Sequence, residues 1–338
     1  MIAAADLTAA ERYEAQAAAA LSAVDVRPPA ALLWYGRRIA VVPSQEPAIE
    51  GAAPTRKQLV AAVGWQLHAD FHGDGTPRPW RRHPVTALGE GGDFLRALSQ
   101  ANCGRGSWQA GWRVAGSDDD RDPLVVVRAD GLRMLAPAEE CAVEGIVARV
   151  RVPKELIGHR PGLYTALGDS TPRADAGADL TTLFWSLAAA GAVTFVARAT
   201  YALNRADMPF RLTLLDNPAR YGRADAVALS VARTDVTSAL TLLRPLLRAL
   251  ARHLADSAPA FCKPLARGLA LAEEPLGAER FGEHRCRLLA EAIVSASERG
   301  LRTPAQRLAV VRERFQTAGV SLDAPYRQAG SVDATQGS

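Results

Sequence analysis

The spacing of apolar residues changes along this chain, and the change limits the folds that it can adopt. In the middle, short apolar runs are separated by turn residues; the runs Leu124–Arg128 and Leu132–Leu135 flank Ala-Asp-Gly, a hairpin signal. Nearer the C-terminus, apolar residues recur at helical spacings of three and four, at positions 236, 240, 243, 247, 250 and 254. Hairpin-like strands with helices at both ends predict an α+β protein with a central, mostly antiparallel sheet.

The same patterns predict the individual elements. Strands are expected at residues 143–152, 163–167, 181–187, 209–215 and 225–231. Helices are expected near residues 8–24, 58–71, 93–100, 188–207, 285–299 and 303–319. Thr8 and Glu11 have the spacing of a capping box, and Pro245 is expected to kink the helix that contains it.

These elements divide the 338 residues into three regions. Residues 1–92 are expected to form a helical N-terminal region, and residues 93–326 an α+β domain. Segments 44–56 and 72–92 are rich in Pro, Gly and charge and are expected to be loops. The polar residues 327–338 are expected to be a disordered tail.

Composition excludes several classes of protein. Hydrophobic residues make up 48% and charged residues 22%, the balance of a globular chain, and the net charge of +4 is too small to indicate nucleic acid. The four Cys are far apart, so neither a disulfide framework nor a four-Cys zinc site is indicated. The N-terminus lacks a secretion signal, and the apolar run Leu183–Ala197 is shorter than the roughly 20 residues that span a bilayer. We therefore expect a soluble cytoplasmic protein with no membrane partner.

Common catalytic motifs are absent from the sequence. It contains no phosphate-binding loop, dinucleotide-binding loop, HExxH or GxSxG. His68 and His72 are four residues apart, but His72 borders a Gly-rich segment, and buried Cys with a surface His explain Cys262, His284 and Cys286 more simply than a metal site does. No metal site is predicted.

Three segments in fixed order resemble the A-type Hop effector family, named for type III secreted effectors of plant pathogens. They are Pro209–Leu229, Phe261–Glu273 and Phe281–Arg287. The segment Gly104–Arg113, the pair Val152-Pro-Lys154 and Pro161-Gly-Leu-Tyr164 are similar to that family too. The resemblance covers roughly residues 95–328, so the region 93–326 is expected to be a Hop effector-like lyase domain.

The resemblance implies a reaction. In class V lanthipeptide and thioamitide pathways, members of this family are thought to act beside a kinase-like protein that phosphorylates Ser or Thr of a ribosomal precursor peptide. The Hop-like partner then eliminates phosphate and leaves dehydroalanine or dehydrobutyrine. The resemblance thus implies a carbon–oxygen lyase that forms a stable complex with the kinase-like protein. No metal or organic cofactor is expected, because a phosphoester already carries its leaving group.

Elimination requires cations that hold the phosphate, and Arg suits this because its planar fork donates two parallel hydrogen bonds. Arg211, Arg220 and Arg223 are expected on a strand, a turn and the next strand, where a hairpin would bring them to one end. Arg285 is expected at a helix N-terminus, which favours anions, and Arg105 stands between two glycines. An ordinary solvated Arg is the alternative for each.

Elimination also requires a base for the α-proton and an acid for the leaving oxygen. Lys263, expected in a Pro-Gly loop, is the predicted base, with Lys154 as the alternative base, and His284 is the predicted acid. Tyr221 is predicted to contact substrate. The competing interpretations are an exposed turn for Lys263, a cap or packing role for His284 and core stacking for Tyr221.

Two other functions compete with the lyase. The first alternative hypothesis is a non-catalytic scaffold that docks a kinase-like partner and its peptide. Nucleic-acid binding would depend on Arg37-Arg38 and Arg81-Arg82-His83, and these short charge clusters indicate it only weakly. No nucleic-acid partner is therefore predicted.

Overall fold

The computed structural model describes residues 8–27, 31–39, 41, 54–74, 92–116, 123–128, 131–172, 179–277 and 279–332. Contacts divide the chain into two units. Unit 1 consists of Met1–His83, Ser257–Leu265 and Glu279–Val332, and unit 2 consists of Pro84–Asp256, Ala266–Ala278 and Asp333–Ser338. Helices from both ends of the chain, which the sequence assigned to separate regions, thus share one unit. The part of the expected tail beyond residue 332 lies outside the described residues.

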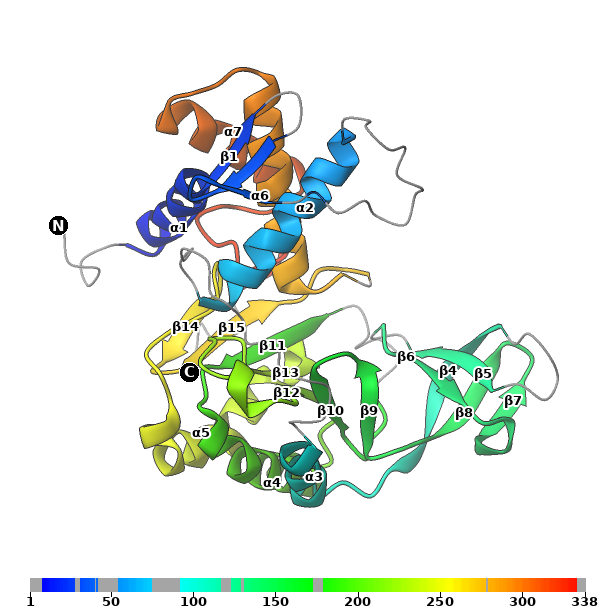
Figure 1. Cartoon of the computed structure of the whole chain (residues 1–338). Helices are drawn as coiled ribbons and strands as arrows, with labels where there is room; N and C mark the ends of the chain where they lie inside the picture. The colour runs from blue at the N-terminus through cyan, green and yellow to red at the C-terminus, as the bar shows by residue number, and fades with distance from the viewer. Residues whose placement is uncertain are drawn as a thin grey trace. The chain divides into compact units, whose positions relative to one another are not determined.

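The described residues of unit 1 form four helices and a small antiparallel sheet of order β1-β2-β3 (Figure 1). The helices are α1 (Ala9–Ala23), α2 (Arg56–Asp70), α6 (Phe281–Glu298) and α7 (Pro304–Thr317), with a short 3-10 turn η1 (His72–Asp74) after α2. The strands are β1 (Val24–Arg27), β2 (Ala31–Trp34) and β3 (Arg37–Ile39). Residues 1–92 were expected to be a helical region, and the structure adds the strands β1 to β3 between the helices α1 and α2. Strands of three or four residues are too short to show an alternating pattern in the sequence.

Capping and aromatic packing explain the helices of unit 1. Helices α1, α2 and α7 each begin with a capping box, in which a Thr hydroxyl and a Glu or Gln side chain satisfy free N–H groups. Helix α2 packs on α6, α6 on α7, and α7 on α1. At the centre, the ring of Phe261 lies edge-on to Phe71 and to Phe315, with ring centroids 5.6 Å apart in both pairs.

A larger sheet has the strand order β14-β15-β11-β13-β12-β10-β9, and its strands from β15 to β9 pair antiparallel with their neighbours. Its strands are β9 (Glu155–Arg160), β10 (Leu163–Leu167), β11 (Leu180–Trp185), β12 (Arg211–Leu215), β13 (Val227–Ala232), β14 (Lys263–Ala266) and β15 (Leu269–Glu273). Helices α4 (Ala189–Arg205) and α5 (Val236–Ala249) cover one face in unit 2, where α3 (Gly92–Ala101) packs on α4 (Figure 1). Phe195 of α4 anchors this layer, with its ring 4.9 Å from that of Trp185. The short 3-10 turns of this unit are η2 (Ala138–Glu140), η3 (Pro218–Arg220), η4 (Arg233–Asp235) and η5 (Ala251–His253).

Unit 2 also contains a five-stranded antiparallel sheet of order β6-β5-β4-β8-β7. The strands are β4 (Ser107–Gly116), β5 (Leu124–Arg128), β6 (Arg133–Ala136), β7 (Cys141–Glu144) and β8 (Val147–Val152). One face is a buried core that includes Trp112, Val126 and Val150. The single strand expected at 143–152 is a hairpin instead, because Gly145 turns the chain at a φ of 64°.

The α+β class is confirmed, and one segment differs from the expectation. Residues 263–273, expected outside any sheet, form β14 and β15. Every residue of β15 is buried, so its sequence shows no polar alternation, and its Ala residues favour a helix in isolation. The helix at 236–254 ends at Ala249, and Leu254 lies beyond it. Among the described helices, none has the length and apolar character to cross a membrane.

Two glycines of unit 2 provide a test of the close packing between β4 and β8. Gly106 has a φ of 72°, and a Cβ placed there would lie 2.7 Å from the carbonyl oxygen of Val152. Gly145 has a φ of 64° with nothing within 4 Å, so it is the matched control. We expect Gly145→Ala to lower the free energy of unfolding by about 1 kcal/mol, the cost of a left-handed residue. Gly106→Ala should cost clearly more in a urea titration, and equal losses would contradict the close contact.

Candidate functional site

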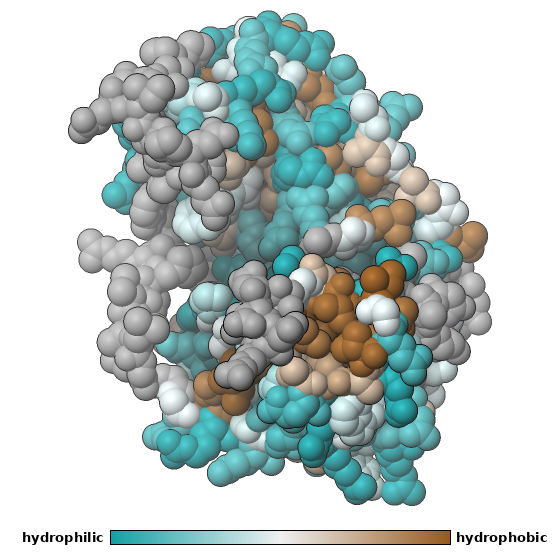
Figure 2. Space-filling view, turned by 90° about the vertical axis from the view of Figure 1, so that its right-hand side faces the viewer, coloured by the Kyte–Doolittle hydropathy of each residue, from teal (hydrophilic) through white to brown (hydrophobic). Residues whose placement is uncertain are grey.

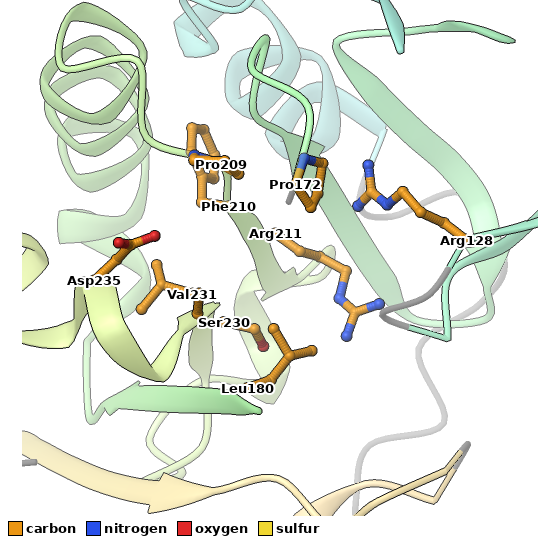
Figure 3. A pocket seen from close by; sticks show the side chains of 10 residues that line it. Arg128, Pro172, Leu180, Pro209, Phe210, Arg211, Ser230, Val231 and Asp235 are labelled. Carbon is orange, nitrogen blue, oxygen red and sulfur yellow. The ribbon is translucent and has the colours of Figure 1, made fainter. Parts of the chain in front are cut away.

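Two buried arginines of unit 2 line one small pocket, partly open to solvent, with a cavity volume of about 30 Å³ (Figure 3). Arg128 and Arg211 are each only 6% exposed. The other lining residues are mostly apolar, with one hydroxyl and one carboxylate: Pro172, Leu180, Pro209, Phe210, Ser230, Val231, Ala232 and Asp235. Two guanidinium charges in such surroundings favour an anion, because a low-polarity lining weakens the screening of charge.

Arg128 is the last residue of β5 and is held by the inner face of the small sheet. It lies opposite Trp112 in the sheet, and its guanidinium carbon is 5.2 Å from the centre of that indole ring. Its Nη1 donates to Oε1 of Gln109 at 2.6 Å, and Gln109 in turn donates from Nε2 to the carbonyl of Gly168 at 3.0 Å. These contacts fix the direction of the Arg128 side chain.

Arg211 is the first residue of β12, and it is paired with Leu167 of β10 and Ser230 of β13. The Ser230 hydroxyl lies 2.8 Å from that of Thr182, so it is part of a polar row across the sheet. Figure 3 shows Arg211 and Arg128 extending from strands of two different sheets, with the Arg128 guanidinium beside Pro172 and the Arg211 guanidinium directed away from Pro172. The fold thus brings together two residues that are 83 positions apart in the sequence.

Arg220 and Arg223 do not join Arg211. They follow β12 in the connection to β13, whereas Arg211 begins β12, so a strand of five residues, about 13 Å long, separates them. Nη1 of Arg220 donates to the carbonyl of Gly162 at 3.2 Å. Arg223 forms a two-pronged ion pair with Asp225, with N···O distances of 2.8 and 2.9 Å. The expected convergence of the three arginines at one end of the hairpin is therefore wrong.

The glycine segment around Arg105 approaches its own chain. The backbone N–H groups of Arg105 and Gly106 both donate to Oδ1 of Asp169 at 2.9 Å, while the Arg105 side chain is exposed. Gly106 packs against the carbonyl of Val152. The close approach predicted from these glycines thus joins β4 to neighbouring segments.

Lys154 closes the end of a helix. Its Nζ donates to the carbonyl of Ser99 at 2.9 Å and to that of Asn102 at 3.4 Å, at the C-terminus of α3. A cation is favourable there because the last carbonyls of a helix have no partners within it. These hydrogen bonds indicate that Lys154 stabilises the C-terminal end of α3.

Tyr221 packs within unit 2. Its hydroxyl donates to the carbonyl of Leu215 at 2.9 Å, and its ring lies edge-on to Phe94 at 5.6 Å. Burial raises the pKa of the Tyr221 hydroxyl, so the neutral, donating form dominates. These contacts match the alternative interpretation of Tyr221 as a packing residue.

Lys263, His284 and Arg285 belong to unit 1. Lys263 begins a strand and not a loop, and its Nζ lies 5.7 Å from the centre of the Tyr326 ring. Arg285 is fully buried and donates to the carbonyls of Pro325 at 2.7 Å and Arg327 at 2.9 Å. Lys263 and Arg285 therefore both hold the segment Pro325–Arg327, and the Arg285 guanidinium offers no exposed surface to a phosphate.

His284 accepts a hydrogen bond at Nδ1 from Nη1 of Arg285, 2.5 Å away. Burial, together with the Arg285 charge, lowers the pKa of His284 to about 4. The ring is therefore neutral at pH 7. The acid role predicted for His284 requires a protonated ring, and a neutral ring suits a base better.

No group of three or more side chains that could hold a metal ion occurs within the described residues. The rings of His68 and His72 stack at 5.4 Å. Cys262 and Cys286 are buried free thiols. The described part of the chain therefore offers the pocket, rather than a metal centre, as its best-defined candidate site.

Comparison with known proteins identifies the family of this chain. The model of the HopA1 effector protein family matches residues 158–327, half of the chain. The chain belongs to this family. The match contains β12 with Arg211 and the unit 1 residues Lys263, His284 and Arg285, whereas Arg128 lies before it.

Two solved structures are similar to the chain. An effector protein from Pseudomonas syringae pv. tomato strain DC3000 is 15% identical, with a TM-score of 0.45 over 82% of this chain and 91% of that one. An effector protein from Pseudomonas syringae pv. syringae strain 61 is 14% identical, with a TM-score of 0.42 over 81% of this chain and 99% of that one. No curated protein matches the sequence.

Sequence reasoning missed Arg128. In the structure, the alternation of β5 that buries Val126 also turns Arg128 inward, but the apolar run before Arg128 does not show in the sequence which face that residue takes. A charged residue at an inward position is rare and is usually paired or functional. The remaining candidates of unit 2 do not line the pocket. Their contacts are described above, and they are Arg105, Lys154, Arg220, Tyr221 and Arg223.

The environment of His284 predicts how the stability of this HopA1-family chain depends on pH. Its folded pKa is about 4, below the ordinary 6.5, so the unfolded state binds a proton between these values and the folded state does not. The stability from this group is complete above pH 6.5 and is lost as the pH falls toward 4. We expect the free energy of unfolding to fall more between pH 7 and pH 5 for the wild type than for His284→Gln, by urea titration. Equal falls would contradict the lowered pKa.

Proposed function

We propose that this chain removes phosphate from phosphorylated Ser or Thr residues of a ribosomal precursor peptide and leaves dehydroalanine or dehydrobutyrine. The observation that carries the proposal is the pair of buried arginines, Arg128 and Arg211, in one pocket of unit 2. Membership of the HopA1 effector protein family supports it, because the resemblance to that family implies this reaction in lanthipeptide pathways.

The two arginine charges would act on the phosphate during the elimination. A base removes the α-hydrogen, the electron pair of that C–H bond forms the new C=C bond, and the C–O bond breaks so that phosphate leaves with its electrons. Negative charge grows on the phosphate oxygens during this step. Guanidinium groups already fixed by Trp112, Gln109 and the strand pairing of Arg211 would stabilise that charge without reorganising.

The base has three candidates. Lys263 remains the base predicted from the sequence, and it is preferred to Lys154, whose amine is bound to the carbonyls at the end of α3. Asp235 lines the pocket that contains the two arginines and is the titratable carboxylate there. Neutral His284 is a further acceptor of a proton.

A phosphorylated substrate requires a kinase, so a kinase-like partner in a stable complex belongs to the proposal, as does a cytoplasmic location. No cofactor is required for the elimination as written. The scaffold alternative predicts the opposite behaviour: a purified chain that co-elutes with the kinase-like partner and never releases phosphate from a phosphopeptide.

Substitution of the pocket arginines tests the phosphate site. We expect Arg128→Ala and Arg211→Ala each to weaken binding of a phosphothreonine peptide by about tenfold to hundredfold, because each removes a charged hydrogen-bond donor. Arg211→Lys keeps the positive charge but loses the forked pair of donors, so its affinity for the peptide should lie between those of the wild type and Arg211→Ala. Arg248→Ala, on the exposed side of α5, is the control. Calorimetric titration measures the affinities. Unchanged affinity in both pocket variants would contradict the assignment of this pocket as the phosphate site.

A second set of variants separates binding from chemistry. If Lys263 is the base, Lys263→Ala abolishes loss of phosphate mass from a bound phosphopeptide while affinity stays largely intact. His284→Ala should do the same if the ring transfers a proton. Asp235→Asn tests the competing candidate. If Asp235→Asn stops turnover while Lys263→Ala remains active, the carboxylate of Asp235 is the base. Full turnover in all three variants would discard these assignments.

A further inference from the structure

The outer face of the five-stranded sheet carries cationic and apolar side chains together, and the phosphate pocket does not account for them. Strand pairing places seven such residues on this face, opposite the face that carries the buried core. We call them the outer sheet face: Arg113, Arg133, Arg149 and Arg151, with Trp108, Leu135 and Val147. Figure 2, which looks onto the side where these strands lie, shows hydrophobic surface bordered by hydrophilic surface.

The apolar members of this face are open to solvent. Leu135 is 63% exposed, Val147 50% and Trp108 45%. The side chains of the four arginines are exposed and form no hydrogen bond or ion pair with any described residue. Glu144, opposite Val147 on β7, is the acidic residue among the described strand positions of this face. Exposed apolar patches beside unneutralised charge are typical of an interaction surface.

The cross-strand order gives the surface a pattern. Arg133, Val127, Arg113 and Val147 face one another in sequence across β6, β5, β4 and β8. Cation and apolar side chain thus alternate at the spacing between strands, about 4.8 Å. One turn of an α-helix advances about 5.4 Å, so side chains three or four residues apart on a helix have nearly the same spacing. A helix lying across the strands, with acidic and apolar residues alternating along one stripe, would match this row.

We propose that the outer sheet face binds an acidic amphipathic helix of the peptide substrate, remote from the phosphorylated residue. The identity of this peptide rests on the proposed function. Val127 and Arg128 are neighbours on β5, one on the outer face and one in the pocket, so this strand takes part in both sites. A peptide held outside therefore has to pass only around that sheet to reach the pocket. The aliphatic members Leu135 and Val147 would find no partners on a nucleic acid, which prefers aromatic stacking surfaces.

A labelled peptide without phosphate tests the surface by itself. The probe is a fluorescein-labelled helix in which Glu and Leu alternate at spacings of three and four residues, and the matched probe has Lys in place of Glu. We expect saturable anisotropy with the Glu probe and none with the Lys probe. Two double variants, Arg149→Glu with Arg151→Glu and Trp108→Ser with Leu135→Ser, should each weaken binding by about tenfold or more.

The control for charge reversal is Arg244→Glu with Arg248→Glu, two exposed positions on α5 of the same unit. It should bind the Glu probe as the wild type does. Thermal unfolding of every variant checks that the fold is retained, and the two double variants share no residue, so misfolding of one leaves the other decisive.

Turnover then distinguishes this inference from the proposed function. A phosphothreonine peptide extended by the Glu/Leu helix should have a KM about tenfold lower than the short peptide, with equal kcat. Arg149→Glu with Arg151→Glu should return the KM to that of the short peptide and leave kcat unchanged. If the wild type converts neither peptide, the proposed function fails, and the labelled probe still decides whether the face binds acidic helices.

Other outcomes overturn the inference. These are absence of binding to the Glu probe, equal binding of the Lys probe, or unaltered affinity in both double variants. Tighter binding of a single-stranded oligonucleotide or of phosphatidylserine vesicles, lost in the same variants, would reassign the face to nucleic acid or to a membrane surface.

Discussion

The burial of two guanidinium groups is the constraint on which unit 2 depends. A buried charge is costly unless fixed dipoles or charges surround it, so the chain must supply them. Gln109 does this for Arg128: its amide accepts from the guanidinium and donates to the carbonyl of Gly168, which follows β10. The same amide thus connects the small sheet to the large one. Asp169, held by the N–H groups of Arg105 and Gly106, adds a second connection at the next residue.

Much of the fold could be predicted from the sequence, because periodicity and caps act locally. The hairpin β5–β6, the helix α7 behind Thr303 and Pro304, and the α+β class all follow from residues close together in the chain. The strand β15 could not be predicted, since Leu269–Glu273 is buried on both faces and carries no alternation. Discontinuous units are equally hidden, because α1 and α7 meet through packing that no local pattern records.

The candidate site divides in the same way. Arg211, which residue type indicated as phosphate-binding, lines a pocket, but type alone also selected Arg223 and Arg285, whose guanidinium groups are held by Asp225 and by backbone carbonyls. Distinguishing a binding arginine from a structural one requires knowledge of its partners, and the sequence contains none. Arg128 shows the same limit, because the run Leu124–Val127 is apolar throughout and does not indicate which face of the strand Arg128 takes.

Alternation also explains how one small sheet can present two surfaces of different character. Successive side chains of a strand point to opposite faces, so Val127 faces outward toward the arginine-rich row and Arg128 faces the pocket. A shift of one residue in the pairing of β5 would exchange them and would bring the Arg128 charge to the outer face. The buried row of Trp112, Val126 and Val150 prevents that shift, because it would expose the apolar core. Packing of the core therefore determines both the charge in the pocket and the pattern outside.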